Sequence, residues 1–328
     1  MSRPSRRTVV AGLSVAAMAP AVSASAQSGK WPERPIKLVV PFPPGGGADF
    51  AARILVVKLA EGLGQTVIVE NRPGAGTAIA NDAVAKAAPD GYTLLQANRD
   101  MAINPSVQIS LPYDTLRSFA WIGKSVEVPV LLCVNPKVPA RSLSELAALA
   151  KAKPGKITIG HFGAGGLIHL NVEAMVRHLG IEMLLVTYKG AGPTLAAVVG
   201  GEIDVALSAL TGALPFIRAD RLRPIAVGLD ARAAQLPGVP TFAESGGGSD
   251  VVVPSYYGLA APAGTPRPII ERISGELKRV MAMPDVIAKH VEGGLVPTFS
   301  TPSDFEAEIA SDVARFDKLV KVVGITPQ

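Results

Sequence analysis

The chain has 328 residues, of which 48% are hydrophobic and only 5% aromatic, and its formal net charge is +5. At roughly 150 residues per domain this length predicts two domains, and a composition dominated by Ala, Val, Leu and Gly favours an α/β protein over an all-β one. No block of five or more basic residues occurs, and aromatic side chains do not interleave with Lys or Arg, so the composition does not support nucleic-acid binding.

The first 26 residues resemble a secretory signal. Arg3, Arg6 and Arg7 precede the apolar stretch Thr8–Val22, which is too short to span a membrane, and Ala24-Ser25-Ala26 supplies a small-residue cleavage pattern. The paired arginines also fit a twin-arginine signal, so export is expected by the twin-arginine or the Sec route. No later segment contains 18 uninterrupted apolar residues, so we expect no membrane span in the exported protein.

The first half of the chain repeats a strand–loop–helix pattern. Strands predicted at Ile36–Val40, Thr66–Glu70 and Tyr92–Gln96 alternate with helices predicted at Phe50–Leu63 and Thr77–Ala88. Strands and helices that alternate at this pace predict right-handed crossovers and a parallel sheet.

Two further strands are predicted at Phe119–Lys124 and Val128–Val134. The second contains Cys133, the single cysteine of the chain. No internal disulfide can therefore form, and the apolar neighbours of this cysteine predict a small buried side chain.

The strand–helix pattern restarts after a helix predicted at Ser142–Ala152. This repetition of architecture, without obvious repetition of sequence, predicts two similar lobes with a cleft between them. The elements expected after that helix are strands at 156–160, 183–187, 203–207, 224–229 and 256–260, helices at 167–179, 194–199 and 267–281, and a mostly helical C-terminal region with a strand near 295–299.

Five loops follow predicted strands and carry the clearest functional signal. All should open at the carboxyl edges of parallel sheets, where α/β proteins hold their ligands. Such loops present backbone N–H groups and helix N-termini but few catalytic side chains, which favours a binder of a small anion over an enzyme. Asp49 is expected to cap the first helix. The loops are Phe42–Asp49, Asn71–Gly76, Asn98–Asp100, Phe162–Gly166 and Tyr188–Gly192.

Sequence motifs for nucleotide binding, catalysis and metal binding are absent. Gly74-x-Gly76 and Gly163-x-Gly165 lack the third glycine of a dinucleotide fingerprint, and there is no P-loop, nucleophile elbow or His-Glu-x-x-His helix. We therefore expect no cofactor and no metal. His169 could cap a helix, line a cleft or bind a ligand, whereas His178 and His290 are expected to face solvent.

At these loops the sequence resembles the periplasmic substrate-binding proteins of tripartite tricarboxylate transporters, also called Bordetella uptake gene (Bug) receptors. The resemblance implies a type II periplasmic-binding-protein clamshell, in which each lobe has a mainly parallel sheet flanked by helices. Residues 27–128 and 256–328 would form lobe 1, and residues 129–255 would form lobe 2. The matching stretches are Trp31–Ile36, Val40–Asp49, Val69–Gly76, Ala88–Leu95, Ala102–Pro105, Tyr188–Gly190, Gly200–Asp204 and Pro262–Pro266.

The resemblance also implies a ligand site. In the family, the Pro-Phe-Pro-Pro-Gly-Gly loop and a facing loop of the second lobe clamp the carboxylate of the ligand, partly through ordered waters. The residues carried over to the first wall are Phe42, Pro44, Gly45, Gly46 and Asp49. Those carried over to the second wall are Gly163, Ala164, Gly165 and His169. Asn98, Arg99, Phe162 and Tyr188 complete the expected set.

The chain departs from the family pattern at two of these loops. His161–Gly166 replaces a hydroxyl-rich run, and residues 96–101 are bulky and charged where the family tends to a small Gly/Ser loop. Arg99 could bind a second carboxylate of the ligand through its fork of donors, or it could form an ion pair with Asp100 or Asp49. Together, Phe162 and Arg99 lead us to expect a dicarboxylate or an aromatic carboxylate.

The leading interpretation is an extracytoplasmic solute receptor in the periplasm, without catalysis, that closes about a hinge on a small carboxylate. It would act as a monomer and deliver the ligand to two integral-membrane transporter subunits. One alternative is a ligand-sensing periplasmic receptor of a two-component system, which needs the same clamshell. Another is an α/β enzyme acting on an organic acid, for which the loops offer only His161, His169 and Asp49 as chemical groups.

Overall fold

The computed structural model describes residues 31–327, and the chain from Pro32 onward forms one compact unit. The signal sequence expected at residues 1–26, with its cleavage pattern, lies outside the described residues. Among the helices of residues 31–327, none combines the length and the apolar character that a membrane span requires.

The first sheet has six strands in the order β11-β4-β10-β3-β1-β2. Strand β1 pairs in parallel with β2 and β3, whereas β10 runs antiparallel to β3 and β4, and β11 antiparallel to β4. We call the part of the chain built on this sheet lobe 1. The strands are β1 Ile36–Val40, β2 Val67–Asn71, β3 Thr93–Asn98, β4 Phe119–Val128, β10 Ser255–Pro262 and β11 Val296–Pro297.

The second sheet has five strands in the order β7-β6-β8-β5-β9, and the part of the chain built on it is lobe 2. Strand β6 is parallel to β7 and β8, and β5 is antiparallel to β8 and β9. Cys133 lies in β5 and is buried, as predicted, and burial raises the pKa of its thiol to about 12. The strands are β5 Val130–Val134, β6 Thr158–Phe162, β7 Leu184–Tyr188, β8 Val205–Ala209 and β9 Arg223–Gly228.

Both sheets are therefore mixed, which corrects the expectation that each is mainly parallel. The reason is that the chain crosses between the sheets without an intervening helix. Strand β4 passes directly through Pro129 into β5, and β10 returns after β9 to insert between β3 and β4. Each of these strands runs against its neighbours. The division of the chain into lobes at residues 128/129 and 255/256, which lie next to these crossings, stays a prediction.

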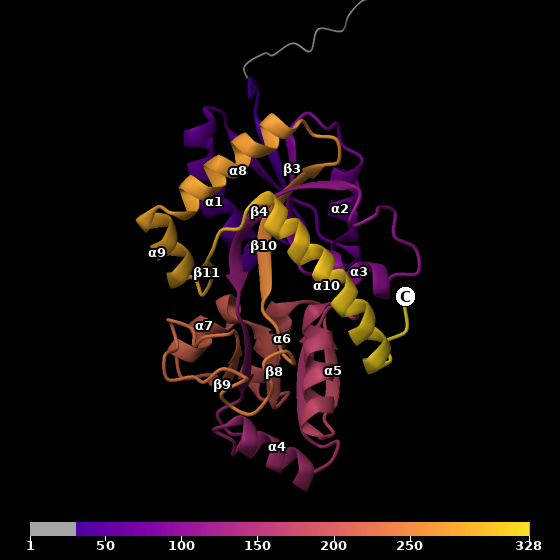
Figure 1. The fold of residues 1–328 in the computed structure, drawn as a ribbon. Coiled ribbons are helices and arrows are strands. Elements are labelled where there is room, and N and C mark those ends of the chain that lie inside the picture. The colour runs from indigo at the N-terminus through magenta and orange to yellow at the C-terminus, as the bar shows by residue number, and fades with distance from the viewer. Residues whose placement is uncertain (1–30, 328) are drawn as a thin grey trace, which may run out of the picture. The chain divides into compact units, whose positions relative to one another are not determined.

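Helices cover both faces of each sheet (Figure 1). In lobe 1, α1 packs on β1 and β2 and α8 on β4, while α2 and α10 pack on the other face. In lobe 2, α4 and α5 share one apolar cluster with the sheet, and α6 and α7 share another. The helices are α1 Gly47–Leu63, α2 Ala78–Ala85, α3 Asp100–Val107, α4 Leu143–Ala152, α5 Leu167–Leu179, α6 Ala191–Gly200, α7 Leu210–Arg218, α8 Arg267–Met281, α9 Pro284–Glu292 and α10 Pro302–Val323, and a 3-10 turn at Ala75–Thr77 precedes α2.

Helices α3 and α7 were not expected from the sequence, and each contains a proline, Pro105 or Pro215. A proline inside a helix removes one backbone hydrogen bond, so it counts against a helix when a sequence is interpreted. In α3, Pro105 has no N–H to donate to the carbonyl of Met101. That carbonyl instead accepts a hydrogen bond of 2.9 Å from the hydroxyl of Thr115. A side chain outside the helix thus replaces the missing backbone hydrogen bond.

Two contacts fix α5 of lobe 2 against the segment that leads into β10. The amide Nδ2 of Asn171 donates to the carbonyl of Val253 at 2.9 Å, and Oδ1 of Asn171 accepts from the amide of Val253 at 3.3 Å. Both residues are buried. Val253 also belongs to an apolar cluster shared by α3, α5 and α10, so this pair anchors a connection between the lobes.

We predict that Asn171→Leu lowers the free energy of unfolding by about 3 kcal/mol, because it leaves the buried N–H and C=O of Val253 unpaired while keeping the volume of the side chain. Urea denaturation followed by circular dichroism measures this loss. Arg177→Leu, an exposed change on the same helix, should cost less than about 1 kcal/mol. Equal losses in the two variants would contradict the proposed importance of the Asn171–Val253 pair.

Candidate ligand-binding site

The two sheets share a topological feature that indicates where a ligand binds. In lobe 1 the chain leaves β1 to form β2 on one side and then β3 on the other, and in lobe 2 it leaves β6 to form β7 and then β8 in the same way. A crevice opens between the carboxyl ends of parallel strands at such a point. The starts of α1 and α3 therefore border the crevice of lobe 1, and the starts of α5 and α7 border that of lobe 2.

The loop between β1 and α1 is braced by Asp49. Its carboxylate accepts hydrogen bonds from the amide of Gly45 at 3.0 Å, from Nε of Arg53 at 2.8 Å and from Nδ2 of Asn71 at 3.1 Å. The same Asn71 amide donates to the carbonyl of Phe42 at 3.0 Å. Arg53, the Gly45 amide and Asn71 lower the pKa of Asp49 although burial opposes them, so Asp49 stays charged.

The start of α1 is left without a side-chain cap. Asp49 lies inside the helix, the N-cap is Gly46, and no side chain hydrogen-bonds there as a cap. The expectation that Asp49 caps α1 is therefore wrong. Pro44, Gly45 and Gly46 are exposed, and Gly45 has a φ of +80°, which only glycine adopts without strain. The first amides of α1 thus face an open loop and carry the partial positive charge of the helix.

Polar side chains at the end of β3 lie beside this loop. Asn98 is fully buried, and its Oδ1 accepts a hydrogen bond of 3.0 Å from the amide of Asp100, while its Nδ2 has no partner. Asn98 pairs in register with Tyr257 of β10, whose ring lies 6.3 Å from that of Phe42. A buried donor without a hydrogen-bond partner in the described part of the chain needs one from elsewhere, and a ligand would supply it.

In lobe 2, the loop between β6 and α5 is closed on itself. The amide of Gly166 donates to the carbonyl of Gly163 at 2.7 Å, and the amide of Gly165 donates to Nδ1 of His169 at 3.0 Å. Phe162, directly before the loop, packs against the apolar cluster of lobe 2. Gly163 and Ala164 are exposed, and Gly165 is packed against Val107 of α3.

His169 and His161 form a stacked pair behind this loop, with ring centroids 4.3 Å apart and an interplanar angle of 8°. Burial lowers the pKa of both rings, and the neighbouring His169 lowers that of His161 further, to about 4. Both rings are therefore neutral at neutral pH. Nδ1 of His169 accepts the hydrogen bond from the amide of Gly165 and so holds the loop, a role that was not among those expected for this residue.

The two remaining histidines differ in their exposure to solvent. His178 is exposed, as expected. His290 is buried in α9, and burial lowers the pKa of its ring to about 4. The expectation that His290 faces solvent is wrong because α9 packs on α1, a contact that no local sequence pattern predicts.

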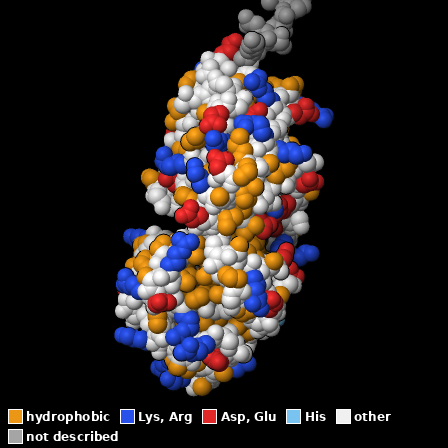
Figure 2. Space-filling view, turned by 90° about the vertical axis from the view of Figure 1, so that its left-hand side faces the viewer, with side chains coloured by type: hydrophobic (Ala, Val, Ile, Leu, Met, Phe, Trp, Pro, Cys, Tyr) orange, Lys and Arg blue, Asp and Glu red, His pale blue; other side chains and the backbone are white. Residues whose placement is uncertain are grey.

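The loops of the two lobes come together. A Cβ atom built on Gly47 would lie only 2.8 Å from the hydroxyl of Thr211 at the start of α7. The amide of Leu167 at the start of α5 donates to Oδ1 of Asp100 at 2.9 Å. Figure 2 shows an indentation between the two lobes on one side of the molecule. The starts of α1 and α7, and those of α3 and α5, thus face each other across the lobes.

Arg99 is not brought to these loops. Its buried guanidinium donates to Asp312 at 3.0 Å, to Glu308 at 3.3 Å and to the carbonyl of Pro254, and it lies over the ring of Tyr256. Arg99 therefore does form ion pairs, but with Glu308 and Asp312 of α10, so the expected pairing with Asp100 or Asp49 is wrong. A partner more than 200 residues away has no local signal in the sequence.

The side chain of Tyr188 is also not directed to these loops. It is the last residue of β7, the edge strand of its sheet, and its hydroxyl donates to Glu202 at 3.0 Å. Glu202 belongs to the turn that precedes β8, so this hydrogen bond lies at the amino end of that strand. Nothing in its contacts directs the hydroxyl of Tyr188 to the loops.

Sequence reasoning missed Thr211 and Tyr257. Thr211 belongs to α7, a helix that was not predicted because it contains Pro215. The rule for loops after parallel strands nevertheless pointed to the residues after β8. Tyr257 lies on an antiparallel strand inserted next to β3, and no sequence pattern indicates that insertion.

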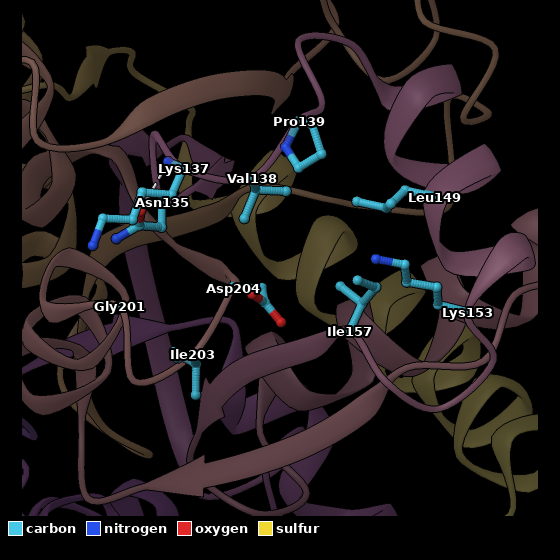
Figure 3. A pocket seen from close by; sticks show the side chains of 10 residues that line it. All are labelled: Asn135, Lys137, Val138, Pro139, Leu149, Lys153, Ile157, Gly201, Ile203 and Asp204. Carbon is cyan, nitrogen blue, oxygen red and sulfur yellow. Dashed lines mark hydrogen bonds between the residues drawn. The ribbon is translucent and has the colours of Figure 1, made fainter.

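A separate pocket of about 240 Å³ lies at the opposite end of lobe 2 (Figure 3). Its lining includes Lys137, Lys153 and Asp204, and Asp204 accepts two hydrogen bonds of 2.9 Å from Thr158. Because these residues precede β6 and β8, the pocket is at the amino ends of the strands, away from the loops described above. Within residues 31–327 no cluster of His, Cys, Asp or Glu has the composition of a metal site.

Comparison with known sequences identifies the family of the chain. The sequence model described as "Tripartite tricarboxylate transporter family receptor" matches residues 51–325. Protein BugT of Bordetella pertussis (strain Tohama I) is 34% identical over 321 residues, which cover 97% of this chain and 98% of BugT.

Two solved structures are similar over nearly the whole length. R. palustris Rpa4515 with adipate has a TM-score of 0.84 at 30% identity and covers 91% of this chain and 100% of that chain. The periplasmic binding protein BugD has a TM-score of 0.82 at 32% identity, with the same coverage of 91% and 100%. The chain therefore has the two-lobed α/β fold of periplasmic binding proteins.

We predict that Arg99→Ala lowers the free energy of unfolding by about 3 kcal/mol, because it leaves the buried carboxylate of Asp312 without its cation. The chain offers a matched control. Arg34 also pairs with an aspartate, Asp90, and lies over a tyrosine ring, but its side chain is 63% exposed. Arg34→Ala should cost less than about 1 kcal/mol. Chemical denaturation compares the two, and a loss for Arg99→Ala no larger than for Arg34→Ala would refute the prediction.

The histidine pair predicts a pH dependence of stability. The pKa of His161 is about 4 in the folded protein and about 6.5 in the unfolded chain, so between these values the unfolded chain binds more protons. Stability should fall as the pH drops from 6.5 to 4, by up to about 3 kcal/mol from this group, and no further below that.

His161→Gln should flatten this fall, measured as the free energy of unfolding from denaturant titrations at pH 7, 6, 5 and 4. His178→Gln, at an exposed histidine, should leave the slope of the wild type unchanged. A slope unaffected by His161→Gln would show that this ring does not stay neutral in the folded state.

Proposed function

Because the chain belongs to the tripartite tricarboxylate transporter receptor family, whose relatives are periplasmic solute-binding proteins and not enzymes, we propose that it binds a small carboxylate in the periplasm and delivers it to a tripartite transporter. The export signal expected at residues 1–26 is consistent with this location. Two integral-membrane subunits would receive the ligand from a monomeric receptor.

The observation that carries this proposal is the open start of α1 beside lobe 2. Gly46 offers no side-chain cap, so the first amides of α1 remain available to an anion. The start of α7 faces them at Thr211, and its N-cap, Ala209, has no capping side chain either. Two helix N-termini that meet across a crevice favour a carboxylate bound between the lobes.

The expected preference for a dicarboxylate or an aromatic carboxylate rests on Arg99 and Phe162. The guanidinium of Arg99 is engaged by α10, which removes its support for a second carboxylate. The rings of Phe42 and Tyr257 beside Asn98 support an apolar or aromatic body in the ligand. We therefore propose a small carboxylate with an apolar or aromatic body, held by Phe42, Gly45, Gly46 and Asn98 in lobe 1 and by residues 162–165 in lobe 2.

Closure of the lobes on the ligand would present a different surface to the membrane subunits. The alternative role as a sensor uses the same closure, and the genes beside this one distinguish the two roles. Two genes for membrane subunits support transport, and a kinase with its response regulator supports sensing.

We predict that Gly46→Asp abolishes carboxylate binding without lowering the melting temperature. At the N-cap an aspartate can accept from the first amides of α1 and stabilise the helix, but its carboxylate then occupies the position proposed for the ligand. The backbone of Gly46 has φ −84° and ψ 174°, and a Cβ there meets only the carbonyl of Pro43 at 3.7 Å, so the fold tolerates the change.

The test is a thermal-shift screen of the purified protein against mono-, di- and aromatic carboxylates, since a ligand that binds only the folded state raises its melting temperature. Wild type should shift by several degrees with at least one acid, and Gly46→Asp with none. Ser142→Asp, which adds the same charge at the N-cap of α4, should bind as wild type does. Binding retained by Gly46→Asp would place the ligand elsewhere.

A further inference from the structure

One helix N-terminus at the crevice is already occupied. Helix α5 has Gly166 as its N-cap and no side-chain cap of its own, but the carboxylate of Asp100 accepts a hydrogen bond of 2.9 Å from the amide of Leu167. The same oxygen lies 3.3 Å from the position of a Cβ on Gly166. By contrast, α4 and α10 are capped by the N-cap residues Ser142 and Thr301.

The cap of α5 comes from the other lobe. Asp100 is the first residue of α3 in lobe 1, and the side chain of Asn98 fixes its backbone through the hydrogen bond from the Asp100 amide. Within residues 31–327 no Lys, Arg or His forms an ion pair with Asp100, because the adjacent Arg99 is directed to Glu308 and Asp312. Burial raises the pKa of Asp100, and the hydrogen bond from the amide of Leu167 opposes this rise. Among the described residues, the start of α5 is therefore the group that favours the charged form of Asp100.

Asp100 also lies close to the polar groups proposed to bind the ligand. The amide of Asp100 donates to Oδ1 of Asn98 at 3.0 Å, and burial together with the charge of Asp100 raises the pKa of Tyr257. Tyr257 pairs in register with Asn98, whose Nδ2 is buried and has no partner. The start of α5, one of the two helix starts of lobe 2 at the crevice, is thus filled by a carboxylate that belongs to the protein.

We infer that Asp100 determines specificity: the receptor binds ligands with a single carboxylate, held at the start of α1, and rejects ligands whose far end carries a second carboxylate. This inference rests on the proposed function. The far end of the ligand would meet Asp100, so a hydroxyl or ammonium group is accepted there and an anion is repelled.

The size of the effect follows from the repulsion between like charges. Two carboxylates about 5 Å apart at an effective dielectric constant of about 20 repel each other strongly enough to weaken binding by more than tenfold. The partial positive charge of α5, about half an elementary charge, cannot offset this repulsion because Asp100 already uses it.

The experiment measures dissociation constants by isothermal titration calorimetry for matched pairs of acids. The pairs are hexanoate with adipate, and benzoate with terephthalate, and 6-aminohexanoate probes a cationic far end. Each is measured with wild type, Asp100→Asn, Asp100→Ser and the remote control Asp317→Asn, whose carboxylate pairs with Lys321 on α10. Asp100→Asn keeps an acceptor for the Leu167 amide, so the fold is maintained, and Asp100→Ser is the second variant should it not be.

Wild type and Asp317→Asn should prefer the monocarboxylate of each pair by at least tenfold, and both Asp100 variants should reduce this ratio at least tenfold. A wild type that binds the dicarboxylate equally well or better, or a ratio unchanged in the Asp100 variants, overturns the inference while the proposed function stands. Unchanged ratios with a lower melting temperature would mean that Asp100 only fastens the lobes. If wild type binds no carboxylate at all, the proposed function fails and the inference fails with it.

Discussion

Every α-helix leaves its first amides without partners inside the helix, and the arrangement of the lobes follows from how these amides are satisfied. Helices α1, α3, α5 and α7 all begin at the carboxyl ends of strands and converge on one region. At α5 the amide of Leu167 is satisfied by Asp100 from the opposite lobe. At α1 no side chain does so. The contrast between a filled and an open helix start gives the crevice its polarity and is the basis of both functional proposals.

Several residues expected to contact the ligand fix the shape of the loops. Asp49 gathers Gly45, Arg53 and Asn71 around its carboxylate, and His169 holds the amide of Gly165. A binding site made of backbone amides needs such supports, because a loop free to move would lose conformational entropy on binding. The side chains in these loops therefore act mainly on the backbone, and the backbone is the group available to the ligand.

The sequence was informative where neighbours along the chain decide the structure. Strands β1, β3 and β6 and the glycine loops after β1 and β6 lie where periodicity and turn residues indicated. Helices α3 and α7 were not predicted because they contain Pro105 and Pro215. In α3 the lost hydrogen bond is replaced by one from Thr115, which lies outside the helix. The antiparallel insertion of β10 and the pairing of Arg99 with Asp312 depend on segments far apart in sequence. No local pattern encodes such contacts, so Thr211, Tyr257 and the true environment of Arg99 required the folded chain.

The uncapped start of α1 has an evolutionary consequence. The group proposed to hold the carboxylate is the main chain, and among point mutations only a substitution by proline removes a main-chain N–H, whereas any substitution of an arginine removes its charge. Attraction for a negative charge is thus inherited with the fold, while the side chains around it are free to diverge. A duplicated gene can then acquire a new nutrient by altering a few wall residues, without passing through an intermediate that has lost all affinity for organic acids.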